Sequence, residues 1–148
     1  MLDNTYIIFA SDNGGCAASG GRNYPLRGQK GTLFEGGLRV EAFMYSSLLP
    51  ASARGKNFHG LFHVSDWFPT LVSMTGSSYT GDDDMPLDGV DQFDSIVHGT
   101  SFPRYKFLYN YKLSYDSGSS YWTNEPFAVR LNKYKLMHTY NSSTAGTW

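Results

Sequence analysis

The stretch YIIFASDNGGCAASGGRNYPLRGQKGTLFEGG, residues 6–37, decides the fold. It opens with five apolar residues at 6–10 and changes at once to SDNGG at 11–15. A short run rich in aromatic and β-branched residues that stops at Asn-Gly-Gly predicts a buried strand ending at a loop. Such a run is typical of the middle of a parallel sheet, where ligands bind outside the carboxyl ends of the strands. Asp12 and Asn13 are therefore candidate ligand-binding residues.

A long loop follows the strand, from residue 11 to residue 37, and contains eight glycines. Loops longer than about 12–15 residues are uncommon in compact domains and are usually functional or disordered. Tyr24, Leu26, Leu33 and Phe34 are apolar anchors, so we expect order. The loop also carries three cations, Arg22, Arg27 and Lys30, set among glycines. This mixture is typical of a backbone that closely approaches an anion.

The composition excludes several classes of protein. The net charge of −1 gives no basic surface for nucleic acid, and one cysteine excludes an internal disulfide framework. No run reaches the about 18 apolar residues that a membrane span requires. The first residues, 1–5, contain no charged segment followed by an apolar one, so we expect no secretory signal in this chain.

The rest of the chain predicts an α/β part followed by a small antiparallel sheet. Residues 38–44 favour a second strand. Asp66 is expected to cap a helix that has Pro69 at its third position, places Phe68, Leu71 and Val72 on one face, and ends at Gly76. Further on we predict a short helix at 92–98, a strand at 105–111, and a tight hairpin of strands 127–131 and 134–138.

Five segments occur in order: NTYIIFASDNGG at 4–15, NYPLRGQKGTLFEGGLRV at 23–40, HVSDWFPTLVSMTG at 63–76, PLDGVD at 86–91 and AVRLNKYKLMH at 128–138. Together they resemble the sulfatase family, which has an alkaline-phosphatase-like fold, and within it the arylsulfatase B, I and J group. The pattern PLRGxKxxLxEGGxR is the most specific. The resemblance implies a C-terminal fragment. Residues 1–80 are expected to be the C-terminal part of the sulfatase α/β domain, and residues 81–148 a small C-terminal α+β subdomain with an antiparallel sheet.

The resemblance also implies what this chain lacks. In the family an Asp pair and a C-x-P-S-R motif, whose Cys becomes the formylglycine nucleophile, lie in the N-terminal portion. Cys16 is followed by Ala17-Ala18-Ser19-Gly20 and lacks both the Pro and the Arg of that motif. Formylglycine is therefore not encoded here, and the missing N-terminal sulfatase portion is an expected partner. We expect no activity from the isolated chain.

By the same resemblance, Asp12 and Asn13 are expected to ligate calcium, and Lys30 to bind the sulfate and assist catalysis. A carboxylate and an amide oxygen are hard donors that suit Ca²⁺, and Asn in place of His favours a hard cation over zinc. A lysine is a compact charge suited to a tetrahedral anion. The alternatives are that Asp12 and Asn13 serve only a turn, and that Lys30 is a solvated lysine.

Other residues are candidates for roles outside direct contact with the metal or the sulfate. Arg27 and Arg39 are expected to brace the loop behind the site, with Arg39 paired to Glu35. Asn141-Ser142-Ser143 is a candidate glycosylation acceptor. His59 and His63 are four apart but lack a metal-site pattern, so we expect His63 to cap or pack at the helix start.

The resulting hypothesis is part of a calcium-dependent sulfatase. Its substrate would be an aryl sulfate or a sulfated sugar such as N-acetylgalactosamine sulfate, with glycosaminoglycans as candidates, and the family resemblance implies a lysosomal or secreted protein. One alternative is a truncated, non-catalytic product that binds a metal or anion weakly. Another is a phosphohydrolase of the same superfamily, against which Asn13 and the PLRGxK loop argue.

Overall fold

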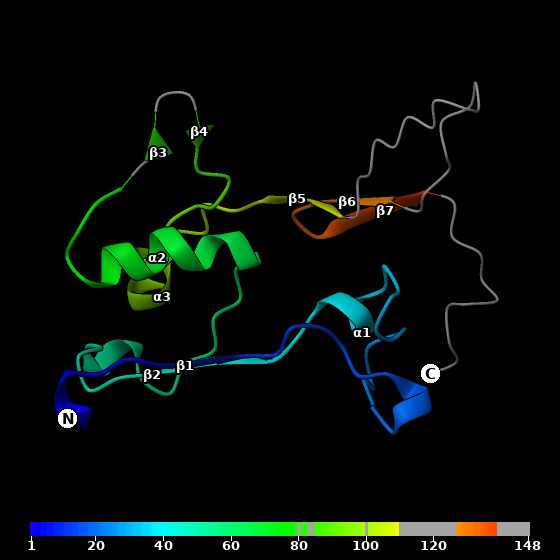
Figure 1. Ribbon diagram of the computed structural model, residues 1–148, viewed down its shortest axis with the longest axis horizontal. Coiled ribbons are helices and arrows are strands. Elements are labelled where there is room, and N and C mark those ends of the chain that lie inside the picture. The colour runs from blue at the N-terminus through cyan, green and yellow to red at the C-terminus, as the bar shows by residue number, and fades with distance from the viewer. Residues whose placement is uncertain (80, 83–84, 100, 110–126, 139–148) are drawn as a thin grey trace. The chain divides into compact units, whose positions relative to one another are not determined.

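The computed structural model describes residues 1–79, 81–82, 85–99, 101–109 and 127–138, shown in colour in Figure 1. Their contacts divide the chain into two units. The helical unit combines Met1–Thr5 with Ser46–Phe107, and the loop unit combines Tyr6–Tyr45 with Leu108–Trp148. The expected domains of the longer protein, 1–80 and 81–148, stay a prediction.

The first strand of the loop unit pairs with the next strand along the chain. Strand β1 (Ile7–Ala10) lies antiparallel to β2 (Ala42–Tyr45), and Phe9 stacks on Phe43 with ring centroids 5.4 Å apart. Aromatic cross-strand pairs of this kind stabilise antiparallel ribbons. The position of the first strand is confirmed, but its expected burial is wrong for the described structure. Phe9 is 51% exposed and Phe43 57%, because a two-stranded ribbon leaves both faces open.

The expected second strand at 38–44 begins late. Residues Glu35–Leu38 form one helical turn, α1, in which Gly36 and Gly37 are buried. The chain becomes extended at Arg39, and β2 starts only at Ala42. The glycines explain the difference, because they let this turn pack tightly against neighbouring backbone.

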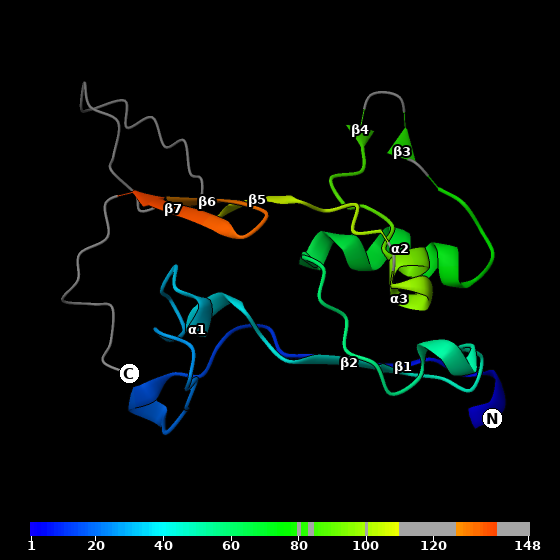
Figure 2. The ribbon, with the colours of Figure 1, turned by 180° about the vertical axis from the view of Figure 1, so that it is seen from behind.

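The predicted hairpin is confirmed. Strands β6 (Phe127–Leu131) and β7 (Tyr134–His138) pair in antiparallel register across the turn at 132–133. Asn132 has φ 51°, a left-handed conformation that asparagine tolerates. Strand β5 (Lys106–Tyr109) completes a sheet in the order β5-β6-β7, seen clearly in the reverse view of Figure 2. It confirms residues 106–109 of the strand predicted at 105–111; residues 110 and 111 lie outside the described residues.

Both predicted helices are present in the helical unit. They are α2 (Trp67–Met74) and α3 (Phe93–His98), and neither they nor the other described helices are long and apolar enough to cross a bilayer. Gly76, with φ 74°, follows α2 as expected. The shorter elements are the 3₁₀ turns Leu2–Asn4, Ala17–Ser19, Ala51–Ala53 and Val64–Asp66, and the two-residue strands β3 (Gly81–Asp82) and β4 (Met85–Pro86). Of these, Ala17–Ser19 belongs to the loop unit.

The apolar face predicted for helix α2 is only partly covered. Phe68 and Leu71 are 51% and 42% exposed and Val72 is half-buried, whereas Pro69 and Thr70 are buried. The Thr70 hydroxyl accepts the backbone N–H of Gln92 at 3.0 Å. This polar contact orients the helix, and hydrophobic periodicity alone does not report it.

Asp66 is the centre of a buried polar network. Its carboxylate is fully buried and accepts the backbone N–H groups of His63 and Val90, both at 2.9 Å. It also accepts Nε2 of Gln92 at 3.3 Å and Nε of Arg104 at 2.7 Å. Burial acts to raise the pKa of Asp66, but these hydrogen bonds, Arg104 foremost, leave the pKa below its ordinary value.

This network corrects one helix-capping expectation and confirms another. Asp66 occupies the position before α2, but its side chain accepts no capping hydrogen bond from that helix. It instead forms a capping box with His63 around the 3₁₀ turn Val64–Asp66. His63 Nδ1 accepts the N–H of Ser65 at 3.3 Å. The expectation that His63 caps the helix start is therefore confirmed.

Candidate functional site

The strand end that carries Asp12 and Asn13 is held by short local hydrogen bonds. Asp12 Oδ1 accepts the N–H of Asn13 at 2.8 Å, and Asn13 Nδ2 donates to the Gly14 carbonyl at 2.9 Å. The Ser11 hydroxyl donates to the Asn13 carbonyl at 3.0 Å. These contacts are the turn chemistry that the alternative interpretation predicted. They use one oxygen of the Asp12 carboxylate and only the nitrogen of the Asn13 amide.

Glycines bring the two ends of the loop into backbone contact. Gly14 N donates to the Gly37 carbonyl at 3.0 Å, and a Cβ on Gly14 would collide with the carbonyl oxygen of Gly36. Gly36 N in turn donates to the Arg27 carbonyl at 2.7 Å. The helical turn α1 therefore joins the end of β1 to the middle of the loop, and only residues without a side chain allow this approach.

Two amide side chains order the loop from within. Asn23 accepts the N–H of Gly15 at 2.7 Å and donates to the carbonyls of Gly15 and Gly28 at 2.9 and 3.1 Å. Gln29 Oε1 accepts the N–H of Ala17 at 2.8 Å. Sequence analysis missed both residues. The only available signal was a pair of amides in a glycine-rich loop, where side chains commonly bond to backbone.

Lys30 returns to the strand end through its backbone. Its N–H donates to the Gly15 carbonyl at 3.2 Å, and its side chain is exposed. The pKa of the half-buried Cys16 thiol is lowered, chiefly by hydrogen bonds from Ser19 and Ala18, with a smaller contribution from the Lys30 charge. The structure records no contact of Lys30 with Asp12 or Asn13 among the described residues.

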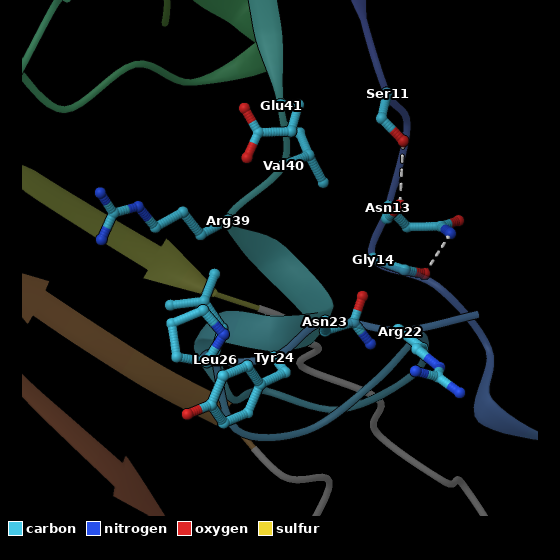
Figure 3. Close-up of a pocket in the computed structure, with 11 residues that line it drawn as sticks. Ser11, Asn13, Gly14, Arg22, Asn23, Tyr24, Leu26, Arg39, Val40 and Glu41 are labelled. Carbon is cyan, nitrogen blue, oxygen red and sulfur yellow. Dashed lines mark hydrogen bonds between the residues drawn. The ribbon is translucent and has the colours of Figure 1, made fainter. Parts of the chain in front are cut away.

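A cavity of about 230 Å³ opens beside the strand end (Figure 3). Asn13 lines it, whereas Asp12 and Lys30 do not. Arg22 and Arg39 also line it, but their guanidinium groups extend to opposite sides in Figure 3. The other lining residues are Ser11, Gly14, Asn23, Tyr24, Pro25, Leu26, Val40 and Glu41. A single pocket shared by Asp12, Asn13 and Lys30 thus stays a prediction.

The two supporting arginines have different surroundings. The Arg27 guanidinium lies over the Phe34 ring, 4.3 Å from its centroid, which is a contact suited to bracing the loop. Arg39 lines the cavity, and the expected pair with Glu35 is not among the described ion pairs. The roles of both arginines stay predictions.

Glu35 binds two cations from the hairpin instead. Arg130 Nη1 and Lys135 Nζ each lie 3.0 Å from one Glu35 carboxylate oxygen. Burial acts to raise the pKa of Glu35, and Lys135 and Arg130 together bring it below its ordinary value. Lys135 also lies 4.6 Å from the centroid of the Tyr109 ring, and burial with the Glu35 charge raises the pKa of Tyr109 to about 12. We call Glu35, Arg130 and Lys135 the Glu35 clamp.

The donor set fits a hard cation only in part. No group of three or more His, Cys, Asp or Glu residues that could hold a metal occurs in the part of the chain that the structure describes. Asp12 and Asn13 offer oxygen donors, the type that calcium prefers, but Ca²⁺ takes 6–8 oxygen ligands. Asp12 and Asn13 fit as two ligands of a larger set. Asn141, the candidate glycosylation residue, lies outside the described residues.

The sulfatase family model matches residues 1–77, more than half of the 148 residues. The chain belongs to the sulfatase family. This sulfatase chain is 38% identical over 146 residues to arylsulfatase J of Mus musculus, covering 93% of this chain and 24% of that protein. It is 33% identical over 114 residues to N-acetylgalactosamine-6-sulfatase of Homo sapiens, covering 74% of this chain and 21% of that protein. The chain thus spans about a quarter of the length of these relatives.

A solved structure gives the fold of the sulfatase chain. The crystal structure of Ps i-CgsB in complex with k-i-k-neocarrahexaose superposes with a TM-score of 0.72 at 28% sequence identity. The match covers 93% of this chain and 28% of that one. With the family match, it confirms the predicted fold class, a partial sulfatase α/β domain of the alkaline-phosphatase-like fold followed by a small antiparallel sheet.

Proposed function

We propose that this chain supplies part of the active site of a calcium-dependent sulfatase that hydrolyses sulfate esters. The observation that carries the proposal is the hydrogen bond from the Lys30 backbone N–H to the Gly15 carbonyl, which holds the backbone of the cationic residue beside the turn that follows Asp12 and Asn13. Two hard oxygen donors and an ammonium are the groups that a sulfate ester and its counter-ion require, and we propose that they meet at this end of the strand.

A sulfated sugar is the favoured substrate. One relative is named as an N-acetylgalactosamine-6-sulfatase, and the structural neighbour was solved with k-i-k-neocarrahexaose, an oligosaccharide. These names support a sugar sulfate, including a glycosaminoglycan, whereas the name of arylsulfatase J keeps an aryl sulfate as the alternative. A lysosomal or secreted location belongs to the same proposal.

The residues of this chain would act by binding and orientation. Asp12 and Asn13 would hold calcium, which when bound stabilises negative charge on the sulfate oxygens. The Lys30 ammonium would bind a further sulfate oxygen and stabilise the charge that develops on the leaving alcohol. The nucleophile would come from outside these 148 residues, since Cys16 lacks the sequence context for formylglycine. Turnover of an aryl sulfate by the isolated chain would contradict this division of roles.

The turn contacts of Asp12 and Asn13 favour one alternative. A non-catalytic product that binds a metal or anion weakly would have the same hydrogen bonds at residues 11–14. A phosphohydrolase of the same superfamily is disfavoured, because the family match is to sulfatases and Asn13 stands where a His is expected.

The test is a titration of the ¹⁵N-labelled chain, first with calcium chloride and then with sodium sulfate. We expect calcium to shift the amide signals of residues 12–15, and Asp12→Asn to remove that shift. Sulfate should shift the Lys30 amide in the calcium-loaded chain, and Lys30→Ala should remove only the sulfate response. Lys56→Ala, a change of an exposed lysine in the helical unit, is the matched control. Equal responses in the two lysine variants would refute the assigned role of Lys30.

A further inference from the structure

The Glu35 clamp joins the loop that carries Lys30 to residues about a hundred positions away. Glu35 is the first residue of α1, and its two partners lie 95 and 100 positions further along the chain. All three side chains belong to the loop unit and are partly buried, with exposed fractions of 30% for Glu35, 23% for Arg130 and 14% for Lys135. Charge pairs held in a partly buried network are less screened by solvent than isolated surface pairs.

The hairpin itself requires a counter-ion at this place. Arg130 and Lys135 stand directly opposite each other in the register of β6 and β7. Like charges directly opposite each other destabilise a pair of strands. The Glu35 carboxylate places one oxygen against each cation, so it compensates both charges at once. The ion pairs therefore act on both segments. Arg130 and Lys135 hold Glu35 in place, and the Glu35 carboxylate offsets the repulsion between the two hairpin cations.

Holding Glu35 fixes the backbone that shapes the proposed site. The next residue, Gly36, donates to the Arg27 carbonyl at 2.7 Å, and Gly37 accepts from Gly14 at 3.0 Å. A displacement of α1 would therefore move both the strand end and the middle of the loop. Lys30 lies between these two attachments and bonds back to Gly15 at 3.2 Å.

We propose that Glu35 is a positioning residue, through which Arg130 and Lys135 of the C-terminal hairpin hold the loop that carries Lys30. The loop then has one arrangement relative to Asp12 and Asn13. This role rests on the proposed function insofar as the loop binds sulfate, whereas the ordering of the loop is independent of any ligand.

Amide hydrogen exchange of the 148-residue chain tests the ordering. We compare Glu35→Gln and Arg130→Gln with the control Lys133→Gln, a change of an exposed lysine in the same hairpin turn. In both clamp variants we expect the amides of Gly14, Lys30 and Gly36 to exchange at least about tenfold faster, since exchange reports local opening. The double variant should be no faster than Glu35→Gln alone, because the same interaction is lost.

Unchanged loop exchange in Glu35→Gln, or exchange equal to that of Lys133→Gln, would overturn the proposal. The amides of Val90 and Gln92 in the helical unit show whether a variant has unfolded as a whole. If they also accelerate in Glu35→Gln, Lys135→Gln decides by the same criterion, since it keeps the Arg130 pair.

Sulfate binding separates positioning from simple stability. With calcium present, we expect Glu35→Gln to weaken the sulfate-dependent shift of the Lys30 amide by about tenfold in affinity, equivalent to about 1.4 kcal/mol. Lys133→Gln should leave the affinity unchanged. Full affinity in a Glu35→Gln chain whose loop exchanges faster would refute the positioning role. If the unchanged chain gives no sulfate response, the proposed function fails, and the exchange result still decides whether the clamp orders the loop.

Discussion

Replacing Asp66 with Asn should destabilise the helical unit severely, although the two side chains have nearly the same shape. Oδ2 of Asp66 accepts from His63 N, Gln92 Nε2 and Arg104 Nε, and Oδ1 accepts from Val90 N and Arg104 Nη2. An asparagine has one acceptor oxygen and one NH₂ donor. In either orientation its NH₂ group therefore faces at least two donors, and the Arg104 charge loses its partner.

The structure sets the size of this effect. Asp66 is fully buried and Arg104 is only 13% exposed, so the change leaves a buried charge uncompensated. Removing one partner of a buried pair typically costs about 3–5 kcal/mol. With a urea dependence of about 2 kcal/mol per M, the unfolding midpoint should fall by about 2 M.

The assay is urea unfolding followed by the fluorescence of Trp67, which packs against Phe62 with ring centroids 4.5 Å apart. Replacing Trp122 and Trp148 with Phe leaves this single probe. Asp94→Asn, at an exposed acidic residue of α3, is the control and should leave the midpoint unchanged. A midpoint for Asp66→Asn within about 0.3 M of the unchanged chain would refute the reasoning, because it would show that the carboxylate charge contributes almost nothing.

Three further outcomes are expected. Gly14→Ala should lower the free energy of unfolding by roughly 2–4 kcal/mol, because the added Cβ overpacks against α1 and breaks a hydrogen bond. It should also speed amide exchange in α1. Gly20→Ala, where a Cβ meets no atom within 4 Å, should leave exchange in α1 unchanged. The pKa values of Asp66 and Glu35 are lowered in the folded state, so both carboxylates stabilise it above about pH 4 and lose this contribution as the pH falls through the folded pKa values. Between pH 7 and pH 2, the urea midpoint of Asp66→Asn should therefore fall less steeply than that of the unchanged chain. Tyr109, with a pKa raised to about 12 from an ordinary value near 10, favours the folded state below pH 10 and loses that contribution between about pH 10 and 12, so Tyr109→Phe should flatten alkaline unfolding in that range.

Local patterns predicted local structure well. The hairpin at 127–138 follows from two short apolar strands around Asn132-Lys133, and the end of α2 follows from Gly76. These signals act within a few residues, so the sequence around each position contains the information. The end of β1 at the Asp-Asn-Gly-Gly turn was predictable for the same reason.

Contacts between distant residues were not predictable in this way. Periodicity placed Phe68, Leu71 and Val72 on one face of α2, but Phe68 and Leu71 are exposed. The buried residue Thr70 is instead held by a hydrogen bond from the backbone of Gln92, 22 positions away. Asp66 was predicted to cap a helix from its local sequence, because its actual partner Arg104 lies 38 positions away and gives no local signal. Glu35 was paired with the nearby Arg39 in sequence, whereas its cations come from the hairpin. In each case a polar side chain has several possible partners in the sequence, and the fold determines which of them lies within hydrogen-bonding distance.

The candidate site therefore depends on backbone placement more than on the reactivity of its own side chains. Asp12 and Asn13 are held by bonds to their neighbours, and Lys30 reaches the strand end through its N–H. An exposed ammonium on a loop of this length binds an anion weakly unless the loop is already ordered. Ordering each loop residue costs about 1–2 kcal/mol in backbone entropy, which would otherwise be subtracted from the binding energy. The glycine contacts of Gly14 and Gly36 and the Glu35 clamp supply that ordering before any ligand binds. Binding energy at the proposed site is then available for the sulfate itself.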